Sequence, residues 1–172
     1  MATAFPFQEA SDIEYQQQWR SANRELLAKL DSARDRQDLP EDTVEFFCKG
    51  QRRLRFSLRS DSVWHGRYVA RGGWTPDSKF FVFATFSSGA HSVWNVMTFA
   101  YSAEANSVVS IDGATHPVTS TEFKIVPPHI LEIETLNPKG IDFPSVKVSL
   151  DLTTLFGRQE AGNTSRQAPT TK

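Results

Sequence analysis

The chain is poor in the features that mark a secreted or membrane-bound protein. Its 172 residues include a single cysteine, Cys48, which excludes a disulfide bridge within the chain. A protein without a second thiol fits a reducing compartment, so we predict a cytoplasmic location. No apolar run reaches the length of a membrane-spanning helix. The N-terminal residues Met1 to Phe7 lack the basic and apolar regions of a secretory signal.

The chain also lacks an excess of charge of either sign. Lys and Arg number 19 against 20 Asp and Glu, which gives a formal net charge of −1. This balance provides no electrostatic basis for binding a nucleic acid or an anionic membrane, and we expect neither as a partner. The densest basic run lies between Lys49 and Arg59. In a strand its arginines would alternate with leucine and phenylalanine, which indicates a solvated outer face over a buried inner face.

Motifs for cofactors and nucleophiles are absent as well. Gly72-Gly73 lacks the lysine and further glycines of a phosphate-binding loop, and Ser87-Ser88-Gly89 is not a nucleophile elbow. The histidines show no metal-ligand spacing; they are His65, His91, His116 and His129. We therefore expect no cofactor and no metal, and we interpret His91 and His129 as solvated turn residues. A three-histidine site assembled from different strands is the alternative.

The N-terminal region carries a helical pattern. Ser11 and Glu14 form a capping box. Apolar residues then recur at spacings of three and four, at Tyr15, Trp19, Ala22, Leu26, Leu30 and Ala33. The pattern predicts an amphipathic helix from about Asp12 to Arg36, ending before Leu39-Pro40. Its apolar stripe would pack on a sheet formed by the rest of the chain.

From about Gly50 onward the periodicity becomes that of short strands. Turn signals separate about eight to ten strands, and no long helix is left for parallel crossovers. The residues from Glu41 to Lys49 favour a strand followed by a hairpin turn at Gly50, with a short helix that begins at Pro40 as the alternative. Val63 to Ala70 is predicted as a strand before a longer loop at Arg71 to Ser78. Asp112-Gly113 predicts a two-residue hairpin turn.

These elements predict an α+β fold that is mainly β. The N-terminal helix would be followed by an antiparallel meander in a closed or partly closed β-barrel, because closure removes exposed edges. The strand spacing resembles calycin-type barrels in outline, without their sequence motifs. A two-sheet β-sandwich is the alternative. We expect an N-terminal extension at residues 1–10, a single domain at 11–156 and a disordered tail at 157–172.

Two central segments are apolar on both alternating faces. Lys79 to Phe86 and Val93 to Tyr101 are therefore expected to be covered on two sides. The last strand, Ser145 to Leu152, alternates cleanly and is predicted to have a polar outer face. A ligand pocket would then lie near the two central segments.

The segment from Trp64 to Trp74 holds the densest group of functional side-chain types. We predict His65, Arg67 and Tyr68 as catalytic residues, with His65 exchanging a proton and Arg67 or Tyr68 holding an oxygen atom. The predicted ligand-binding residues surround them, namely Trp64, Trp94, Asn95, Met97, Phe99 and Tyr101. The plainer interpretation is that the face with His65 and Arg67 is exposed to solvent, whereas Trp64 and Tyr68 pack in the core. Glu132 and Glu134 share one strand face, either as an acid–base pair inside a barrel or as a solvated outer face.

The leading functional hypothesis is a barrel that binds an apolar or aromatic small molecule. If catalytic, it would be a cofactor-free isomerase, cyclase or dehydratase that acts by proton transfer. The alternative is a non-enzymatic protein-interaction module, such as an assembly factor, an inhibitor or an immunity-type protein, that uses the helix or a sheet edge. A protein partner or a homodimer belongs to this second hypothesis. A carbohydrate-binding sandwich that stacks sugars on Trp64, Trp74 and Trp94 is a third.

Overall fold

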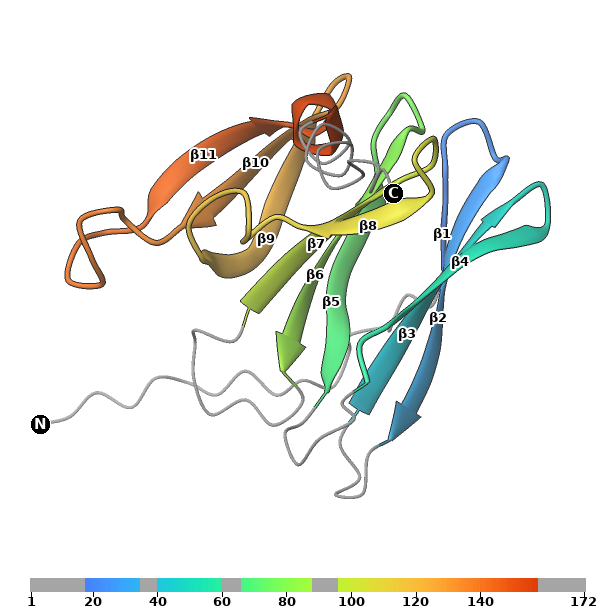
Figure 1. The fold of residues 1–172 in the computed structure, drawn as a ribbon, viewed down its shortest axis with the longest axis horizontal. Helices are drawn as coiled ribbons and strands as arrows, with labels where there is room; N and C mark the ends of the chain where they lie inside the picture. Colours follow the sequence, from blue (N-terminus) through green and yellow to red (C-terminus); the bar gives the residue numbers. More distant parts are fainter. Residues whose placement is uncertain (1–17, 35–39, 60–65, 88–95, 158–172) are drawn as a thin grey trace, which may run out of the picture.

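The fold is known from a computed structural model that describes residues 18–34, 40–59, 66–87 and 96–157. These residues form strands β1 (Gln18–Arg20), β2 (Leu26–Arg34), β3 (Pro40–Cys48), β4 (Gln51–Ser57), β5 (Arg67–Trp74), β6 (Phe80–Ser87), β7 (Val96–Ser102), β8 (Ser107–Ser110), β9 (Val118–Val126), β10 (Ile130–Thr135) and β11 (Val146–Asp151). The strands make three antiparallel sheets, which we name A (β1-β2-β3-β4), B (β5-β6-β7-β8) and C (β11-β10-β9) (Figure 1).

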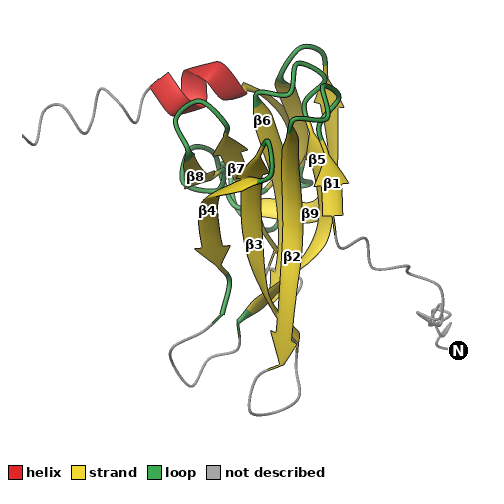
Figure 2. Cartoon of the chain, turned by 90° about the vertical axis from the view of Figure 1, so that its right-hand side faces the viewer, coloured by secondary structure: helices red, strands yellow, loops and turns green. Residues whose placement is uncertain are grey.

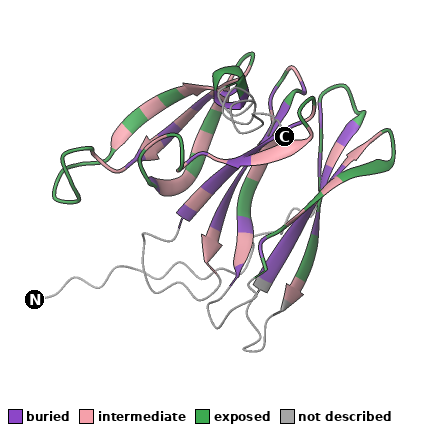
Figure 3. Cartoon of the chain, in the orientation of Figure 1, coloured by how far each residue is buried: buried purple, intermediate pink, exposed green. Residues whose placement is uncertain are grey.

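Sheet B is the middle layer of the molecule. Along β6 every residue from Phe80 to Thr85 is buried (Figure 3). Phe81 and Phe83 pack with sheet A, whereas Phe80 and its alternating partners pack with sheet C. A strand that is covered on both faces needs apolar side chains at successive positions. The prediction that the central strands are covered on two sides is therefore confirmed for their described residues.

The mainly β, antiparallel character of the fold is confirmed, but the closed barrel is not. Each sheet of the described residues has two open ends in its strand order. Sheet B buries its two apolar faces by stacking against a sheet on each side, so the described strands have no need to close on themselves. The arrangement is consistent with the sandwich alternative.

The N-terminal helix is not formed in the described part of its predicted range. Residues 18–20 and 26–34 are strands β1 and β2, which pair as a hairpin with Trp19 opposite Ala28. Leu26, Ala28 and Leu30 alternate with period two, and all three are buried. The spacing that suggested a helix arises because a turn, with Arg24 at a φ of 62°, separates Trp19 from Leu26.

The predicted strand and hairpin around Gly50 are confirmed. Cys48 pairs with Gln51, and the turn places Lys49 and Gly50 at φ values of 48° and 82°. The outer face of the hairpin is solvated, as its arginines indicate. Arg55 Nη2 lies 3.0 Å from Asp31 Oδ2 on the neighbouring strand β2.

Buried acids at the start of β3 connect sheet A to sheet B. Asp42 Oδ2 accepts a hydrogen bond from the Val69 backbone N–H at 2.6 Å. Glu41 Oε1 accepts one from Gly66 N at 2.7 Å. A Cβ atom on Gly66 would collide with Glu41 Oε1 and would lie 2.7 Å from the Leu58 carbonyl oxygen, so only glycine fits this approach.

Strand β5 extends further than its sequence predicts. The Gly72-Gly73 pair lies inside the strand, although it was expected to begin a long loop. A Cβ atom on Gly72 would come within 2.6 Å of the Phe81 ring. Glycine is needed here because the Trp19 and Phe81 rings pack over this strand with their centroids 5.4 Å apart.

Asp112-Gly113 does not form the predicted hairpin. After β8 the chain leaves sheet B, and β9 begins sheet C. The Asp112 carboxyl group accepts hydrogen bonds from Thr98 N and Val118 N, both at 2.9 Å. These bonds hold a connection between two sheets, which local turn signals do not distinguish from a hairpin.

The described chain ends in a short helix at residues 152–157 (Figure 2). Its apolar residues Leu152, Leu155 and Phe156 join the core between sheets B and C. Asp151 caps the helix, because its Oδ1 accepts a hydrogen bond from Thr153 N at 2.8 Å. Gly157, the first residue of the predicted disordered tail, belongs to this helix, and residues 158–172 lie outside the described residues, as does the N-terminal extension.

Candidate functional site

Two of the three predicted catalytic residues, Arg67 and Tyr68, are among the described residues. His65 lies outside the described residues, so its role as a proton carrier stays a prediction. Arg67 and Tyr68 are half-buried at the start of β5. Burial lowers the pKa of the Arg67 guanidinium, and nearby Asp112 opposes this shift. The Tyr68 ring lies 6.1 Å from that of Phe86 on the neighbouring strand.

The predicted ligand-lining residues divide in the same way. Trp64, Trp94 and Asn95 lie outside the described residues. Phe99 and Tyr101 are 8% and 1% exposed, and Met97 packs beside them in the core between sheets A and B. These described members of the predicted lining therefore serve as packing between two sheets.

Aromatic rings fill the space next to Phe99 and Tyr101. The Tyr101 ring stacks on Phe46 with centroids 3.8 Å apart, and Phe99 lies 5.3 Å from Phe83. The Tyr101 hydroxyl donates a hydrogen bond to Asn106 Oδ1 at 3.0 Å. Burial raises the pKa of this hydroxyl, with Arg53 opposing the shift. A buried, hydrogen-bonded tyrosine of this kind stabilises the core.

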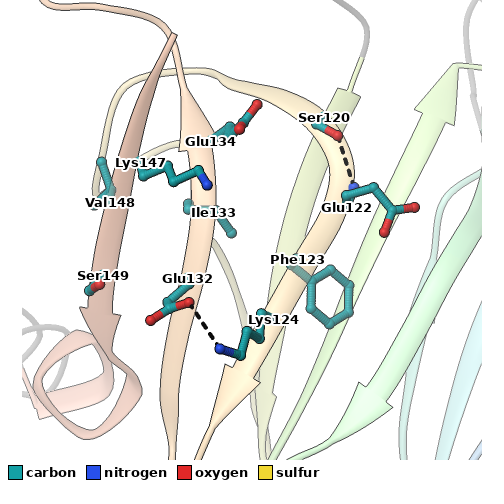
Figure 4. Close-up of a pocket in the computed structure, with 10 residues that line it drawn as sticks. All are labelled: Ser120, Glu122, Phe123, Lys124, Glu132, Ile133, Glu134, Lys147, Val148 and Ser149. Carbon is teal, nitrogen blue, oxygen red and sulfur yellow. Dashed lines mark hydrogen bonds and ion pairs between the residues drawn. The ribbon is translucent and has the colours of Figure 1, made fainter.

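A surface pocket of about 530 Å³ lies over sheet C (Figure 4). It is lined by Ser120, Glu122, Phe123, Lys124, Glu132, Ile133, Glu134, Lys147, Val148 and Ser149. We name this feature the sheet C pocket. Glu132 and Glu134 do share one strand face, opposite the buried Leu131 and Ile133. They lie on the outer face of the sheet.

An irregularity in β9 shapes this pocket. Ile133 pairs with Phe123, but Thr135, two residues further along β10, pairs with Val118. The extra residues of β9 form a bulge, which bends the strand and re-aims its side chains. Ser120 and Glu122 lie in this bulge and line the pocket. Residues 119–122 contain no glycine, proline, asparagine or aspartate, and Ser120, whose hydroxyl accepts a hydrogen bond from Glu122 N at 3.0 Å, is too weak a turn signal to mark the bulge.

Opposite charges are interleaved within the pocket. Lys124 Nζ lies 3.8 Å from Glu132 Oε2, and Figure 4 shows the two side chains directed toward each other. Glu134 and Lys147 occupy paired positions on β10 and β11. Glu122 is ion-paired with Arg71 of sheet B. This arrangement suits a ligand that offers charged or polar groups of both signs above an apolar floor.

The loop between β10 and β11 displays apolar side chains. Ile141 is 68% exposed and Phe143 is 47% exposed. The loop is internally braced, because Asn137 Nδ2 donates to the Pro144 carbonyl at 3.1 Å and Lys139 Nζ lies 5.9 Å from the Phe143 ring centroid. It projects from the end of sheet C on the hairpin that carries Glu134 and Lys147 (Figure 1).

His129 lies in a turn, as predicted, but its side chain is only 17% exposed. Its Nδ1 is 2.9 Å from Asp77 Oδ2, and its Nε2 is 3.6 Å from Asp151 Oδ1. Burial raises the pKa of Asp77, but hydrogen bonds from Thr75 and His129 outweigh this and leave it lowered. The pKa of Asp151 is also lowered, chiefly by the hydrogen bond from the Thr153 hydroxyl.

Sequence reasoning missed this Asp77–His129–Asp151 cluster because two of its members lie in separate turns and the third ends strand β11. The cluster joins the β5–β6 turn, the β9–β10 turn and the start of the short helix. The Phe80 ring covers it, with its centroid 5.9 Å from that of His129. The His129 ring lies between two carboxyl groups, and these contacts connect the end of sheet C to sheet B.

The described residues include no group of three or more metal-ligating side chains arranged to hold an ion. No described helix is both long and apolar enough to cross a membrane. Comparisons with models of known protein families, with curated proteins and with solved structures find no match for this chain.

Proposed function

We propose that this protein is a non-enzymatic interaction module that binds a protein partner through sheet C. The binding face consists of the sheet C pocket together with Ile141 and Phe143 of the β10–β11 loop. The observation that carries the proposal is the exposure of these two large apolar side chains, at 68% and 47%. Among the described residues, these two are the large hydrophobic residues whose side chains are exposed.

Exposed apolar residues on a braced loop are suited to anchor a partner. Transfer of such side chains from water into a partner's pocket is favourable by about 1.5–3 kcal/mol each when burial is complete. The interleaved charges of the pocket then add orientation and selectivity. The chemistry of this face therefore fits a protein with an apolar recess next to charged groups of both signs.

Small-molecule binding is the second candidate. The sheet C pocket, at about 530 Å³, falls within the range of about 300–1,000 Å³ typical of ligand sites. Its polar outer walls favour a ligand with charged groups over the apolar or aromatic ligand expected from the sequence. Arg67 and Tyr68 do not line this pocket, so proton-transfer catalysis by His65, Arg67 and Tyr68 stays a prediction separate from this second candidate.

Affinity capture with the full chain distinguishes the two candidates. The double variant Ile141→Ser with Phe143→Ser should reduce recovery of a specific protein partner by about tenfold or more. The matched control is Glu104→Ser with Ala105→Ser, which changes two exposed residues of the β7–β8 turn. This control should retain the partner, and circular dichroism should show both variants folded.

The proposal fails if every captured protein is retained equally by the loop variant and the control. Saturable binding of a charged small molecule, abolished by Lys147→Ala but not by the loop variant, would establish the second candidate instead. Calorimetric titration of the wild type and of both variants supplies that measurement.

A further inference from the structure

Strand β11 ends sheet C with an edge that no other described strand covers. We propose that this edge pairs antiparallel with the same edge of a second copy of the chain. The product is a symmetric dimer in which two three-stranded sheets join into one continuous sheet. The edge shares Lys147, Val148 and Ser149 with the sheet C pocket but does not include the exposed loop, so the variant of Ile141 and Phe143 tests the proposed function separately from the dimer.

The hydrogen-bond pattern shows which backbone groups the edge offers. Leu152 N donates to the His129 carbonyl, and this pair continues the register in which Asp151 lies opposite Ile130. In an antiparallel ladder, directly bonded pairs alternate with unbonded ones. The backbone groups of Val148 and Leu150 are therefore bonded to β10. Those of Lys147, Ser149 and Asp151 point away from it.

The residues whose backbone groups point away from β10 are complementary in charge to the same residues of a second copy. A two-fold axis at Ser149 places Ser149 opposite its own copy in a hydrogen-bonded pair. The same register places Lys147 of each copy opposite Asp151 of the other. Two reciprocal pairs of opposite charge result, and opposite charges at directly paired positions stabilise a sheet. Asp151 is 42% exposed at its side chain, so it remains accessible although its Oδ1 also caps the helix.

The apolar residues on the inner face of β11 also match those of the second copy in this register. Val148 would lie opposite Leu150 of the second copy, and Leu150 opposite Val148. Both residues pack against the core between sheets B and C but are only half-buried. A second copy would cover their remaining exposed surface and extend the core across the junction.

Other described edges fit self-pairing less well. Strands β5 and β9 also end their sheets, but each has a register shift in its pairing, and such irregularities disturb an edge ladder. Strand β1 has three residues and β8 has four, which makes both short for a stable ladder. Strand β4 exposes Arg52, Arg53 and Arg55. Self-pairing of β4 would bring arginines together, and like charges at paired positions are destabilising. The β11 edge contains no proline and no bulge that would block pairing.

The first test uses proline at the centre of the edge. At about 100 µM the full chain should sediment with about twice its monomer mass of 19.4 kDa. Ser149→Pro removes a backbone N–H that points away from β10, so it should raise the dimer dissociation constant by about tenfold or more. Ser149→Ala keeps that N–H and should dimerise like the wild type. Circular dichroism confirms that each variant is folded.

The second test reverses the charge pairs. Lys147→Asp alone sets aspartate against aspartate, and Asp151→Lys alone sets lysine against lysine, so each variant should be monomeric. Mixing the two restores both opposite-charge pairs and should restore a dimer. A monomeric wild type, or a dimer unaffected by Ser149→Pro, overturns the proposal. If Asp151→Lys fails to fold, the comparison of Ser149→Pro with Ser149→Ala decides alone.

Discussion

Asp42 places a carboxyl group between two apolar layers, where its hydrogen bonds determine how sheets A and B meet. It is 3% exposed. Its two oxygens accept hydrogen bonds from Val69 N and from the Ser32 hydroxyl, both at 2.6 Å. A buried donor that loses its acceptor costs about 1–3 kcal/mol. The packing of sheet A on sheet B therefore depends on this side chain.

Asp42→Ala should lower the free energy of unfolding by about 2 kcal/mol or more, because it leaves the Val69 N–H buried without an acceptor. Urea denaturation followed by tryptophan fluorescence measures the change. Asp31→Ala is the matched control, since Asp31 is an exposed acid paired with Arg55 and Arg59. Its cost should stay below about 1 kcal/mol. Equal losses in both variants would contradict the role given to Asp42.

Acid should weaken the cluster around His129. The pKa values of Asp77 and Asp151 are lowered in the folded protein, so each group binds a proton less readily when folded than when unfolded. The resulting stabilisation is present above the unfolded pKa of about 3.9 and is lost as the pH falls through the lower folded value. The free energy of unfolding should therefore decline below about pH 4.

Asp77→Asn tests this pH dependence. At neutral pH the variant should be less stable than the wild type, because it loses the charged partner of His129. The difference should shrink as the pH falls through the lowered pKa of Asp77, because the wild-type carboxyl group then loses its charge as well. Urea denaturation at several pH values gives the comparison, with Asp142→Asn in the exposed loop as the control. A difference that stays constant with pH would show that Asp77 acts only through packing.

The β1–β2 hairpin could not be distinguished from a helix by the spacing of its apolar residues alone. Trp19, Leu26 and Leu30 are buried, as the helical stripe required, yet they belong to two strands. Intervals of three and four match a helix, but they also arise when a turn interrupts a period of two. Ala22, the helical residue between them, is exposed in that turn. Only the long-range pairing of β2 with β3 resolves the ambiguity.

Ala28 separates the two interpretations experimentally. It is fully buried in β2, whereas Lys29 beside it is exposed. Ala28 is not part of the helical stripe. Ala28→Asp should therefore prevent folding or cost about 3 kcal/mol or more, because it buries an unpaired charge. Lys29→Asp should cost less than about 1 kcal/mol. Thermal unfolding followed by circular dichroism compares the two, and similar stabilities would contradict the hairpin.

The candidate site was less predictable than the strands that carry it. The shared face of Glu132 and Glu134 follows from strand alternation alone. The pocket beside them depends on the bulge in β9, and the His129 cluster depends on two turns and the end of β11 meeting in space. Neither leaves a local signal in the sequence. The exposure of Ile141 and Phe143 could not be predicted from the sequence either, because apolar residues in a loop can pack inward or outward.

At the scale of the whole molecule, the two-sided apolar pattern of the central strands was the most informative sequence feature. It correctly indicated that β6 and β7 are covered on both faces. It could not show whether the cover is a closed barrel wall or two further sheets. That choice depends on where the chain changes sheets, between β4 and β5 and again between β8 and β9.

The layered arrangement predicts a gradient of local stability. Strand β6 is central within sheet B and buried on both faces, so its amides should exchange with solvent most slowly. Amides of β4, which ends sheet A, should exchange faster. Hydrogen–deuterium exchange by mass spectrometry measures this order. Exchange in β6 as rapid as in β4 would contradict a middle layer.

The position of sheet B also determines which apolar surface is uncovered while the chain is being translated. Among the described residues, the cover over Phe80, Val82 and Ala100 comes from residues 118–156, which are synthesised after sheets A and B. While β9 to β11 are still within the ribosome, the nascent chain presents an uncovered apolar surface. Such surfaces attract chaperones and promote aggregation. We therefore expect the chain to depend most on chaperones while β9, β10 and β11 are being translated.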